Sequence, residues 1–390
     1  MSMSDLAATS GDRSLYFWHM IQSPHQADLV AALAEASDSR ITYVFEEELS
    51  SDRRRLGWVP PDFGRARLAR VRSDDEVADM VRLLTRHDLS ICQGLRANGL
   101  VGEAERVMLR SGMRYAVVLE AVEDRGWRGL VRRGLYRRIL RHRARAIRFI
   151  LAIGGSTGRW LQDCGAHDIP IYEFAYFLDP LATAAAAPGG QERFVIGYVG
   201  QLIERKRVDL LLDAAAQLEA SRPVRLVVVG DGPLRASLER RARLMPEHVE
   251  IRWEGVRESA DARRLIAGMD CLVLPSRHDG WGAVVSEALL AGVPAVCSDG
   301  CGVAGVVQCS GAGGVFPAGD AAGLAALLER IVSAGPYTAE ARAQLADWAA
   351  TCISGAAGAA YLREILEHVD AGAGPRPVAP WRRPAPTAPT

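Results

Sequence analysis

Lysine is almost absent from this chain: among its 390 residues only Lys206 is a lysine, so arginine supplies nearly all of the 47 basic residues. The 47 acidic residues balance them, which excludes a chain that binds polyanions over its whole surface. Apolar runs of the ~20 residues needed to cross a bilayer are missing too. The polar first residues, MSMSDLAATSGDRS, lack the apolar core of a signal peptide. We therefore expect a cytoplasmic protein.

Paired cysteines are also missing. The seven cysteines are odd in number and lie mostly in apolar segments, without the CxxC or histidine spacing of a zinc site. We expect reduced thiols, no metal site and no cofactor. The acidic cluster Asp74, Asp75 and Glu76 opens a predicted helix, where acids favour the helix dipole, so we interpret it as a helix cap.

Strand and helix patterns alternate along the chain. From Arg193 onward the apolar runs FVIGYV, RLVVV, VEIRW, CLVL and PAVCS are separated by amphipathic segments, and six fainter strands precede them in the N-terminal half. Such alternation is typical of parallel sheets with helices on both faces. The predicted class is α/β, with two Rossmann-like, doubly wound domains that face an interdomain cleft.

The expected domain boundaries follow from composition. The first domain covers 1–185 and the second 186–355, followed by a C-terminal helix at 356–370. The stretch 182–191, ATAAAAPGGQ, is typical of a flexible linker. The Pro-rich residues 371–390 are predicted to be disordered.

The segment 274–298, LPSRHDGWGAVVSEALLAGVPAVCS, carries the most specific pattern. It reads as a buried strand, a glycine turn and a helix that Pro294 ends. A helix N-terminus near Gly282 is a site for anions, phosphate above all. The carboxylates of Asp279 and Glu287 would instead accept hydrogen bonds from hydroxyl groups. A diphosphate flanked by polyols describes a nucleotide sugar.

Lys206 supports the same interpretation by its position. It follows the strand FVIGYVG at a loop-to-helix junction, and ligands of α/β folds bind at the carboxyl ends of strands. Lysine is a compact point charge that commonly binds phosphate. A surviving lysine codon would explain the residue by chance, but its place after a strand favours phosphate binding.

These residues bring the chain to a known family. Residues 193–334 resemble the retaining glycosyltransferases of family 4 (group 1), in the subset with DGWG in the turn. The resemblance rests on VGQLIERKRVDLLLDA, VVVGDGPLRASLE, LPSRHDGWGAVVSEALLAGVPAV and GAGGVFPAGDAAGLAALL. It implies the GT-B fold of two facing Rossmann-like domains and a metal-independent hexosyltransferase without a protein nucleophile. The first domain would then hold the acceptor and the second the nucleotide sugar.

The resemblance also implies roles for single residues. Asp279 would contact donor-sugar hydroxyls and Glu287 the ribose, while the amides of Gly280, Trp281 and Gly282 would face the sugar and the diphosphate. With Lys206, the two acids form the predicted catalytic set.

The diphosphate clamp departs from the family pattern. Lys206 stands at the family's lysine position, but the arginine expected five residues earlier is Gln201. Arg205, Arg207 or the helix N-terminus would supply the missing charge. The resemblance places Gly200, Gln201 and Arg205 around the donor, and Val256 in the turn that holds the base through its main chain.

The N-terminal half resembles the family less. Where members have a Gly-Gly loop, this chain has IQSPHQ, which puts His25 and Gln26 on the possible acceptor side. Glu120 stands near the place of a frequent family histidine. For these positions a structural and an acceptor-binding interpretation are equally open.

The segment 125–148 contains ten arginines, with apolar residues at 131, 135 and 139 and two aromatic residues, Trp127 and Tyr136. A basic amphipathic helix suits the surface of an anionic membrane. An ordinary helix that packs its apolar stripe on the sheet is the equal alternative. No nucleic-acid reading motif accompanies the arginines.

The sequence therefore predicts a glycosyltransferase that moves a sugar from a UDP- or GDP-sugar to a lipid-linked saccharide, in exopolysaccharide, capsule or lipopolysaccharide synthesis. It would be cytoplasmic, with a possible peripheral contact to the inner face of the membrane. A GT-B-fold epimerase and a binding or scaffold protein with weakened catalysis stay open, the latter because of Gln201 and the absent Gly-Gly loop.

Overall fold

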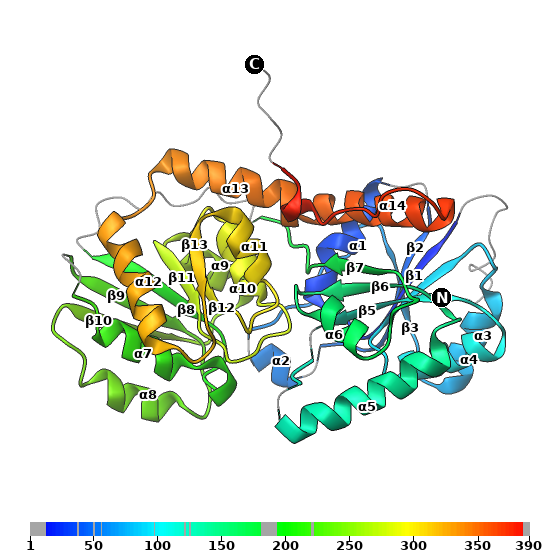
Figure 1. Ribbon diagram of the computed structural model, residues 1–390, viewed down its shortest axis with the longest axis horizontal. Coiled ribbons are helices and arrows are strands. Elements are labelled where there is room, and N and C mark those ends of the chain that lie inside the picture. Colours follow the sequence, from blue (N-terminus) through cyan, green and yellow to red (C-terminus); the bar gives the residue numbers. More distant parts are fainter. Residues whose placement is uncertain are drawn as a thin grey trace, which may run out of the picture. The chain divides into compact units, whose positions relative to one another are not determined.

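The computed structural model describes residues 13–36, 39–49, 51–55, 57–96, 98–120, 122–124, 126–180, 193–219 and 222–384. The chain forms two compact units (Figure 1), each with its own sheet. The first unit takes Met1–Ser50, Pro60–Phe177 and Gly355–Ala379, and the second takes Ser51–Val59, Leu178–Ser354 and Pro380–Thr390. The linker expected at 182–191 lies outside the described residues.

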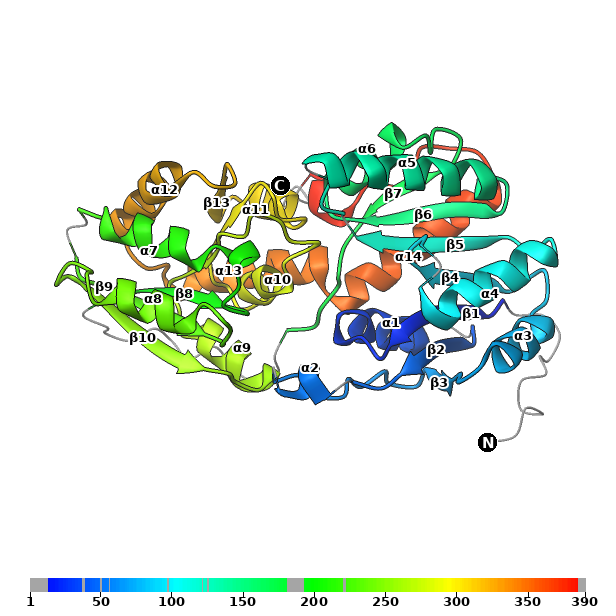
Figure 2. The ribbon, with the colours of Figure 1, turned by 90° about the horizontal axis from the view of Figure 1, so that it is seen from below.

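Seven parallel strands form the sheet of the first unit, in the order β3-β2-β1-β4-β5-β6-β7, as Figure 2 shows. Leu15 in β1 pairs with Ile41 on one side and with Leu89 on the other. The strand order reverses between β1 and β4, and doubly wound sheets bind ligands at such a point. The bounds are Leu15–Ile21 (β1), Ile41–Glu47 (β2), Arg67–Arg70 (β3), Leu89–Gln93 (β4), Tyr115–Glu120 (β5), Ile147–Ile153 (β6) and Ile171–Phe174 (β7).

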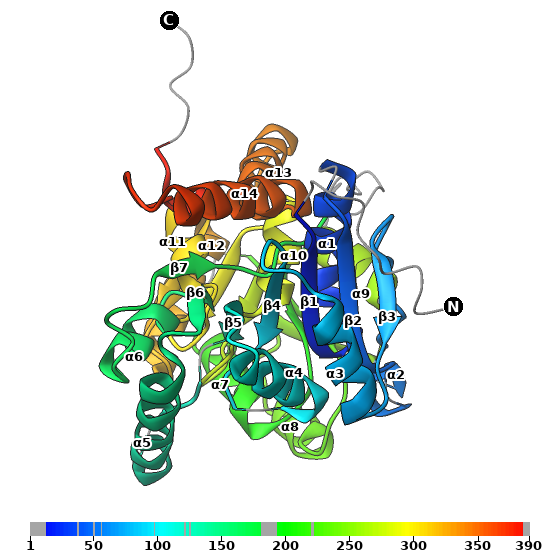
Figure 3. The ribbon, with the colours of Figure 1, turned by 90° about the vertical axis from the view of Figure 1, so that its right-hand side faces the viewer.

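Helices cover both faces of this sheet (Figure 3). On one face lie α1 (Pro24–Ala36) and α14 (Gly355–Ala371); on the other lie α3 (Asp74–Leu83), α4 (Gly99–Arg110), α5 (Gly126–Arg143) and α6 (Thr157–Asp163). The strands are apolar on both faces because each face is covered. Ser73 caps α3 by accepting a hydrogen bond from the Glu76 amide at 3.2 Å. The Glu76 carboxylate in turn accepts one from the Arg72 amide, so the acidic cluster is a helix start, as predicted.

Six parallel strands form the sheet of the second unit, in the order β10-β9-β8-β11-β12-β13. Here the order reverses between β8 and β11. The bounds are Phe194–Val199 (β8), Val224–Val229 (β9), Val249–Gly255 (β10), Cys271–Leu274 (β11), Ala295–Ser298 (β12) and Gly313–Phe316 (β13). Both sheets confirm the predicted α/β class with two Rossmann-like units.

The helices of the second unit form two groups. α7 (Val208–Ala216) contacts α8 (Arg235–Ala242) and α12 (Ala321–Ala334). α10 (Ala283–Leu290) contacts α9 (Ser259–Ala267) and α13 (Ala339–Ile353). The remaining elements are α11 (Ala304–Ser310), α2 (Ser51–Arg55) and the 3₁₀ turns η2 (Glu204–Lys206) and η3 (Pro380–Arg382). None of the described helices is both long and apolar enough to cross a membrane.

The chain is divided differently from the expected boundary at residue 185. Helix α14 packs on the first unit, where the Tyr361 hydroxyl donates to the Glu173 carbonyl at 3.1 Å. Gly358 lets α14 approach Phe177 so closely that an added Cβ would lie 2.4 Å from its ring. In the opposite direction, the backbone at Gly57 accepts a hydrogen bond from the Ser259 amide of the second unit. Close packing on Phe177 accompanies the first exchange and a backbone hydrogen bond the second, and chain order reveals neither contact.

The Pro-rich end is ordered further than its composition predicts. Disorder was expected from residue 371, but the structure describes the chain to residue 384 and forms η3 there. Trp381 is 3% exposed, and its ring lies 6.2 Å from that of Trp281. A buried tryptophan removes a large apolar area from water, which explains why η3 is held on the second unit.

Candidate functional site

The site predicted in the second unit lies at the carboxyl ends of two neighbouring strands, β8 and β11. Ile196 in β8 is paired with Cys271 in β11, and Gly197 with Leu272. The loops that follow these strands therefore leave the sheet at the same edge. One loop carries residues 200–207 and the other carries the DGWG turn. Gly200 adopts φ 152°, and an added Cβ would lie 2.9 Å from the Tyr198 hydroxyl oxygen.

An ion pair joins the two loops. Lys206 Nζ donates to Asp279 Oδ2 at 2.6 Å, and the side chains are 15% and 14% exposed. Arg205 is the second cation: its Nη1 donates to the His278 carbonyl at 2.7 Å and lies 3.7 Å from Asp279 Oδ2. The Arg277 amide donates to the Arg205 carbonyl at 2.8 Å. Two positive charges thus stand beside one carboxylate, at the place where the sequence predicts a diphosphate.

The DGWG turn is held by the loop after β12. Asp279 donates through its amide to the Gly300 carbonyl and accepts through its carbonyl from the Gly302 amide, both at 3.0 Å. An added Cβ on Gly302 would lie 2.1 Å from the Gly280 carbonyl oxygen, so the close approach requires glycine.

Helix α10 begins directly after this turn, with Gly282 as its N-cap at φ 103°. The Trp281 side chain is buried, and its Nε1 donates to Ser286 Oγ at 3.0 Å, so the ring fixes the turn to the helix. Among the described residues, the amides of Gly280, Trp281 and Gly282 donate to no other protein group. Three neighbouring unpaired amides at a helix start are suited to an anion.

Glu287 lies on α10, and the sequence analysis missed its partner. Arg263 in α9 donates from Nε to Glu287 Oε1 at 3.0 Å and from Nη1 to the Asp179 carbonyl at 3.3 Å. Nothing in the DARRLIAGM pattern distinguished Arg263 from its neighbour Arg264, because only the packing of α9 on α10 shows which of them faces Glu287.

Gln201 and Val256 are both exposed. The Gln201 carbonyl accepts a hydrogen bond from the Tyr198 hydroxyl at 2.8 Å. This hydrogen bond from a buried side chain holds the backbone of the loop at Gln201. Burial raises the pKa of Tyr198, and the Asp279 carboxylate acts in the same direction. Val256 follows β10, which β9 separates from β8.

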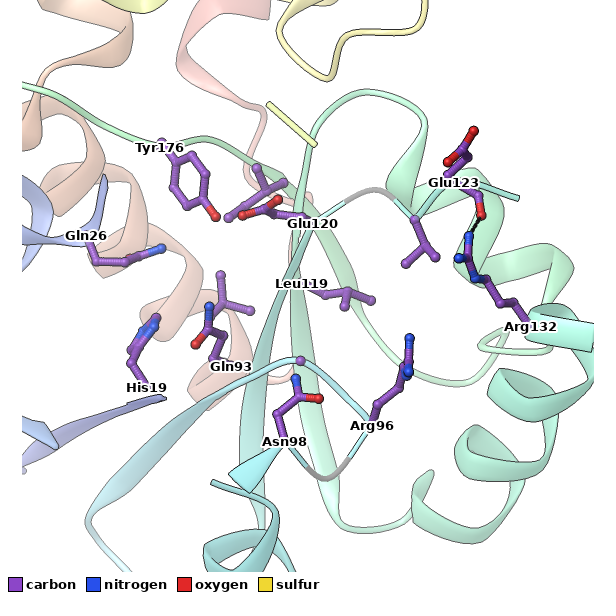
Figure 4. Close-up of a pocket in the computed structure, with 14 residues that line it drawn as sticks. His19, Gln26, Gln93, Arg96, Asn98, Leu119, Glu120, Glu123, Arg132 and Tyr176 are labelled. Atoms are coloured by element: carbon purple, nitrogen blue, oxygen red, sulfur yellow. Dashed lines mark hydrogen bonds between the residues drawn. The ribbon is translucent and has the colours of Figure 1, made fainter. Parts of the chain in front are cut away.

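A pocket of about 420 Å³ lies in the first unit (Figure 4). Two of the residues that the sequence analysis placed on the possible acceptor side, Gln26 and Glu120, line it. His25 is not among the lining residues; its ring stacks on that of Tyr176, which does line the pocket, at 5.0 Å. The residues that the sequence analysis missed are His19, Gln93, Arg96, Asn98 and Arg132.

His19 is the most unusual of these residues. It is 2% exposed, and neither ring nitrogen makes a hydrogen bond of acceptable geometry within the described part of the chain. The ring stacks on Tyr43 at 5.0 Å. Burial lowers the pKa of His19 to about 3, with the neighbouring Gln93 side chain acting in the opposite direction. A polar residue near the carboxyl end of the apolar strand SLYFWHM was the available signal.

The structure of α5 differs from the interpretation of 125–148 as a helix that packs an apolar stripe at 131, 135 and 139 on the sheet. The helix ends at Arg143, and Tyr136 and Leu140 face the core, where Tyr136 meets the edge of Trp160. Val131 and Leu135 are instead exposed, at 63% and 43%. Trp127 and Leu130 are each 71% exposed. We call these four residues the apolar row of α5.

The chain is similar in sequence and in fold to known proteins. Residues 185–349 match the family model described as "Glycosyl transferases group 1". The fold of the whole chain is the GT-B fold, as two solved structures show. Anabaena Alr3699/HepE in complex with UDP and glucose has a TM-score of 0.66, with 16% identity, 91% of this chain and 99% of that chain covered. The lipopolysaccharide outer core galactosyltransferase WaaB has a TM-score of 0.67, with 15% identity, 92% and 99% covered.

Among curated proteins, the chain is 31% identical over 182 residues to a GDP-mannose-dependent alpha-mannosyltransferase of Mycobacterium tuberculosis (strain CDC 1551 / Oshkosh). The match covers 47% of this chain and 44% of that protein. The chain thus spans less than half the length of this relative.

Proposed function

We propose that the protein is a retaining glycosyltransferase of the DGWG-containing subset that uses a nucleotide sugar without a metal ion. The observation that carries the proposal is the ion pair between Lys206 and Asp279 beside the start of α10. It brings a cation, a carboxylate and unpaired amides to the switch point of the second sheet, where a nucleotide sugar needs them. The relative that uses GDP-mannose and the solved structure with UDP and glucose support UDP or GDP as the nucleotide.

Each side chain has a distinct task in this proposal. Lys206 binds the diphosphate and stabilises its charge as it departs, while Asp279 accepts hydrogen bonds from the donor sugar. Glu287, held by Arg263, accepts hydrogen bonds from the ribose. These hydrogen bonds to charged groups contribute about 1.5–3 kcal/mol each.

Arg205 supplies the charge that Gln201 lacks. Its guanidinium already lies 3.7 Å from the same Asp279 oxygen that Lys206 contacts, so both cations reach one point. Gly200 and Gln201 shape the loop around the diphosphate, and the main chain at Val256 holds the base. In this arrangement Arg205 supplies the positive charge that the family places on an arginine at the position of Gln201.

The acceptor binds in the first-unit pocket, with Gln26 and Glu120 on its wall and His25 behind Tyr176. We propose a lipid-linked saccharide in exopolysaccharide, capsule or lipopolysaccharide synthesis. The apolar row of α5 and the arginines of 125–148 would contact an anionic membrane at its cytoplasmic face. The exposed tryptophan at the start of the row, Trp127, is the residue type expected at such an interface.

The test measures thermal stability of the full chain against UDP-, GDP-, ADP- and dTDP-sugars. A donor at about 100 times its dissociation constant adds about 2.7 kcal/mol to the free energy of unfolding. We expect one nucleotide class to stabilise the wild type but not Lys206→Ala. Arg241, which pairs with Asp213 on the exposed side of α8, gives the matched control Arg241→Ala, which keeps the shift.

Transfer is then measured with the nucleotide sugar that binds. Turnover with retention of the anomeric configuration would support the proposal. Binding without transfer or hydrolysis would favour a nucleotide-sugar-binding scaffold, and conversion of the donor sugar to its epimer would favour an epimerase. A wild-type rate in Glu287→Ala would overturn the assignment of the donor site.

A further inference from the structure

The first-unit pocket has two chemically different ends (Figure 4). His19, Gln26 and Gln93 lie on one side, and Tyr176 and Glu120 stand next to them at the rim. Arg96, Arg132 and Glu123 lie on the opposite side, beyond Leu119. One end thus offers uncharged donors and acceptors with one carboxylate at the rim, and the other offers two guanidinium groups and one carboxylate.

The two arginines share their end of the pocket with the Glu123 carboxylate. Among the described residues, however, no carboxylate forms an ion pair with Arg96 or Arg132. Arg132 donates from Nη1 to the Glu123 carbonyl, which leaves most of its five N–H donors for another partner. Two guanidinium groups in one pocket, neither in an ion pair, favour a phosphate, whose oxygens accept parallel hydrogen bonds from arginine.

The opposite end fits hydroxyl groups. A neutral imidazole has one donor and one acceptor nitrogen, and both nitrogens of the buried His19 lack a protein partner of acceptable geometry. A buried polar atom without a partner is costly, so a ligand hydroxyl is the natural complement. The amide of Gln26, which is also buried, adds both kinds of hydrogen-bonding group.

We infer that the acceptor carries a phosphate next to its saccharide, with Arg96 and Arg132 binding the phosphate and His19 and Gln26 binding sugar hydroxyls. The inference rests on the proposed function, because it names the chemistry of that acceptor. Phosphate recognition would favour a phosphorylated sugar over a neutral glycoside in the pocket.

The experiment measures, by calorimetry on the full chain, the binding of glucose 1-phosphate, methyl α-glucoside and inorganic phosphate. We expect glucose 1-phosphate to bind more tightly than either of the others, because only it fills both ends. Arg96→Gln and Arg132→Gln should each weaken its binding about tenfold, as expected for one hydrogen bond to a charged group. His19→Asn should weaken glucose 1-phosphate and methyl α-glucoside alike.

Two matched variants control this result. Arg128 lies on the same helix, exposed, with its guanidinium 5.4 Å from the Trp127 ring centroid, so Arg128→Gln should bind glucose 1-phosphate as the wild type does. Lys206→Ala identifies binding at the donor site. If Lys206→Ala lost the phosphate while Arg96→Gln kept it, the phosphate would belong to the donor site and the inference would be wrong. Equal binding of methyl α-glucoside and glucose 1-phosphate would also overturn it.

A separate readout distinguishes this inference from the proposed function. Arg96→Gln and Arg132→Gln should keep the stabilisation by the nucleotide sugar, since the donor residues lie in the other unit. If the wild type bound no nucleotide sugar, the proposed function would fail, and calorimetry would still decide phosphate binding by the two arginines.

Vesicles distinguish the two sources of such a phosphate. Retention on phosphatidylcholine vesicles that contain phosphatidylinositol, lost in Arg96→Gln, would support a phosphate borne by a lipid. Tight glucose 1-phosphate binding with equal vesicle retention of wild type and Arg96→Gln would support a soluble phosphosugar. The absence of both effects would overturn the inference.

Discussion

Lys206 and Asp279 lie 73 positions apart in sequence, yet their charged groups approach to 2.6 Å. Without a bound donor, the Lys206 ammonium and the Asp279 carboxylate therefore form an ion pair with each other. In the proposed function, an entering diphosphate would take over the positive charge, and the carboxylate would turn to the hydroxyls of the donor sugar. The pair keeps two partly buried charges satisfied without ligand, which explains how a binding site of opposite charges stays folded when empty.

Lys206→Ala is predicted to reduce transfer by about 30- to 1000-fold, because it removes a charge that stabilises the departing diphosphate. Lys206→Arg should restore part of the rate, since the charge returns with a different geometry. The measurement is kcat/KM with the donor identified by thermal stability, checked by circular dichroism for an unchanged fold. A wild-type rate in Lys206→Ala would place the diphosphate elsewhere.

Arg263 is predicted to act through Glu287. Arg263→Gln should raise KM for the donor about tenfold with a smaller change in kcat, because it loosens the carboxylate that binds the ribose. The adjacent Arg264 pairs with Asp261 on the exposed side of α9, so Arg264→Gln gives a control of the same chemistry. Equal effects of the two variants would contradict a positioning role and indicate a general effect on α9.

The sequence predicted those parts of the structure that consecutive residues encode, and it missed those that depend on contacts between distant residues. The β8 and β11 strands, the Lys206 loop and the DGWG turn are consecutive patterns, so their class and shared sheet edge followed from strand alternation alone. Arg263 gave no such signal, because only its contact with Glu287 distinguishes it from Arg264. His19 gave only the signal of a polar residue near the end of an apolar strand, and its burial against Tyr43 is visible only in the structure. The same holds for α14, whose unit is decided by contacts with Phe177 and Glu173 and not by its place after the second domain.

Trp381 is predicted to stabilise the second unit although it lies in a Pro-rich end. Trp381→Ala should lower the free energy of unfolding by about 3 kcal/mol, as for other buried tryptophans. It should also weaken donor binding, since the ring packs on Trp281 in the DGWG turn. Trp127→Ala, at a 71% exposed position, is the control and should leave stability unchanged within about 0.5 kcal/mol. A Trp381→Ala protein as stable as Trp127→Ala would contradict the packing role.

The apolar row of α5 is predicted to hold the protein on anionic membranes. Replacing Trp127 and Leu130 by Ser should reduce cosedimentation with phosphatidylglycerol vesicles, and so should replacing the exposed Arg138 and Arg141 by Gln, by about 1 kcal/mol for each arginine. Added salt should weaken the arginine contribution and spare the apolar one. Unchanged binding in both variants would return α5 to a purely structural helix.

His19 is predicted to make the protein sensitive to acid. Its pKa in the folded state, about 3, lies below the ordinary value of about 6.5, because burial disfavours the charged ring. The folded state therefore binds fewer protons than the unfolded state between these values. The contribution of His19 to stability is complete above about pH 6.5 and is lost as the pH falls toward 3, by as much as about 4 kcal/mol. Urea unfolding of the wild type and His19→Asn across this range measures the difference, and the exposed His167 gives His167→Asn as the control. Parallel curves for wild type and His19→Asn would show that the ring is not buried as a neutral group.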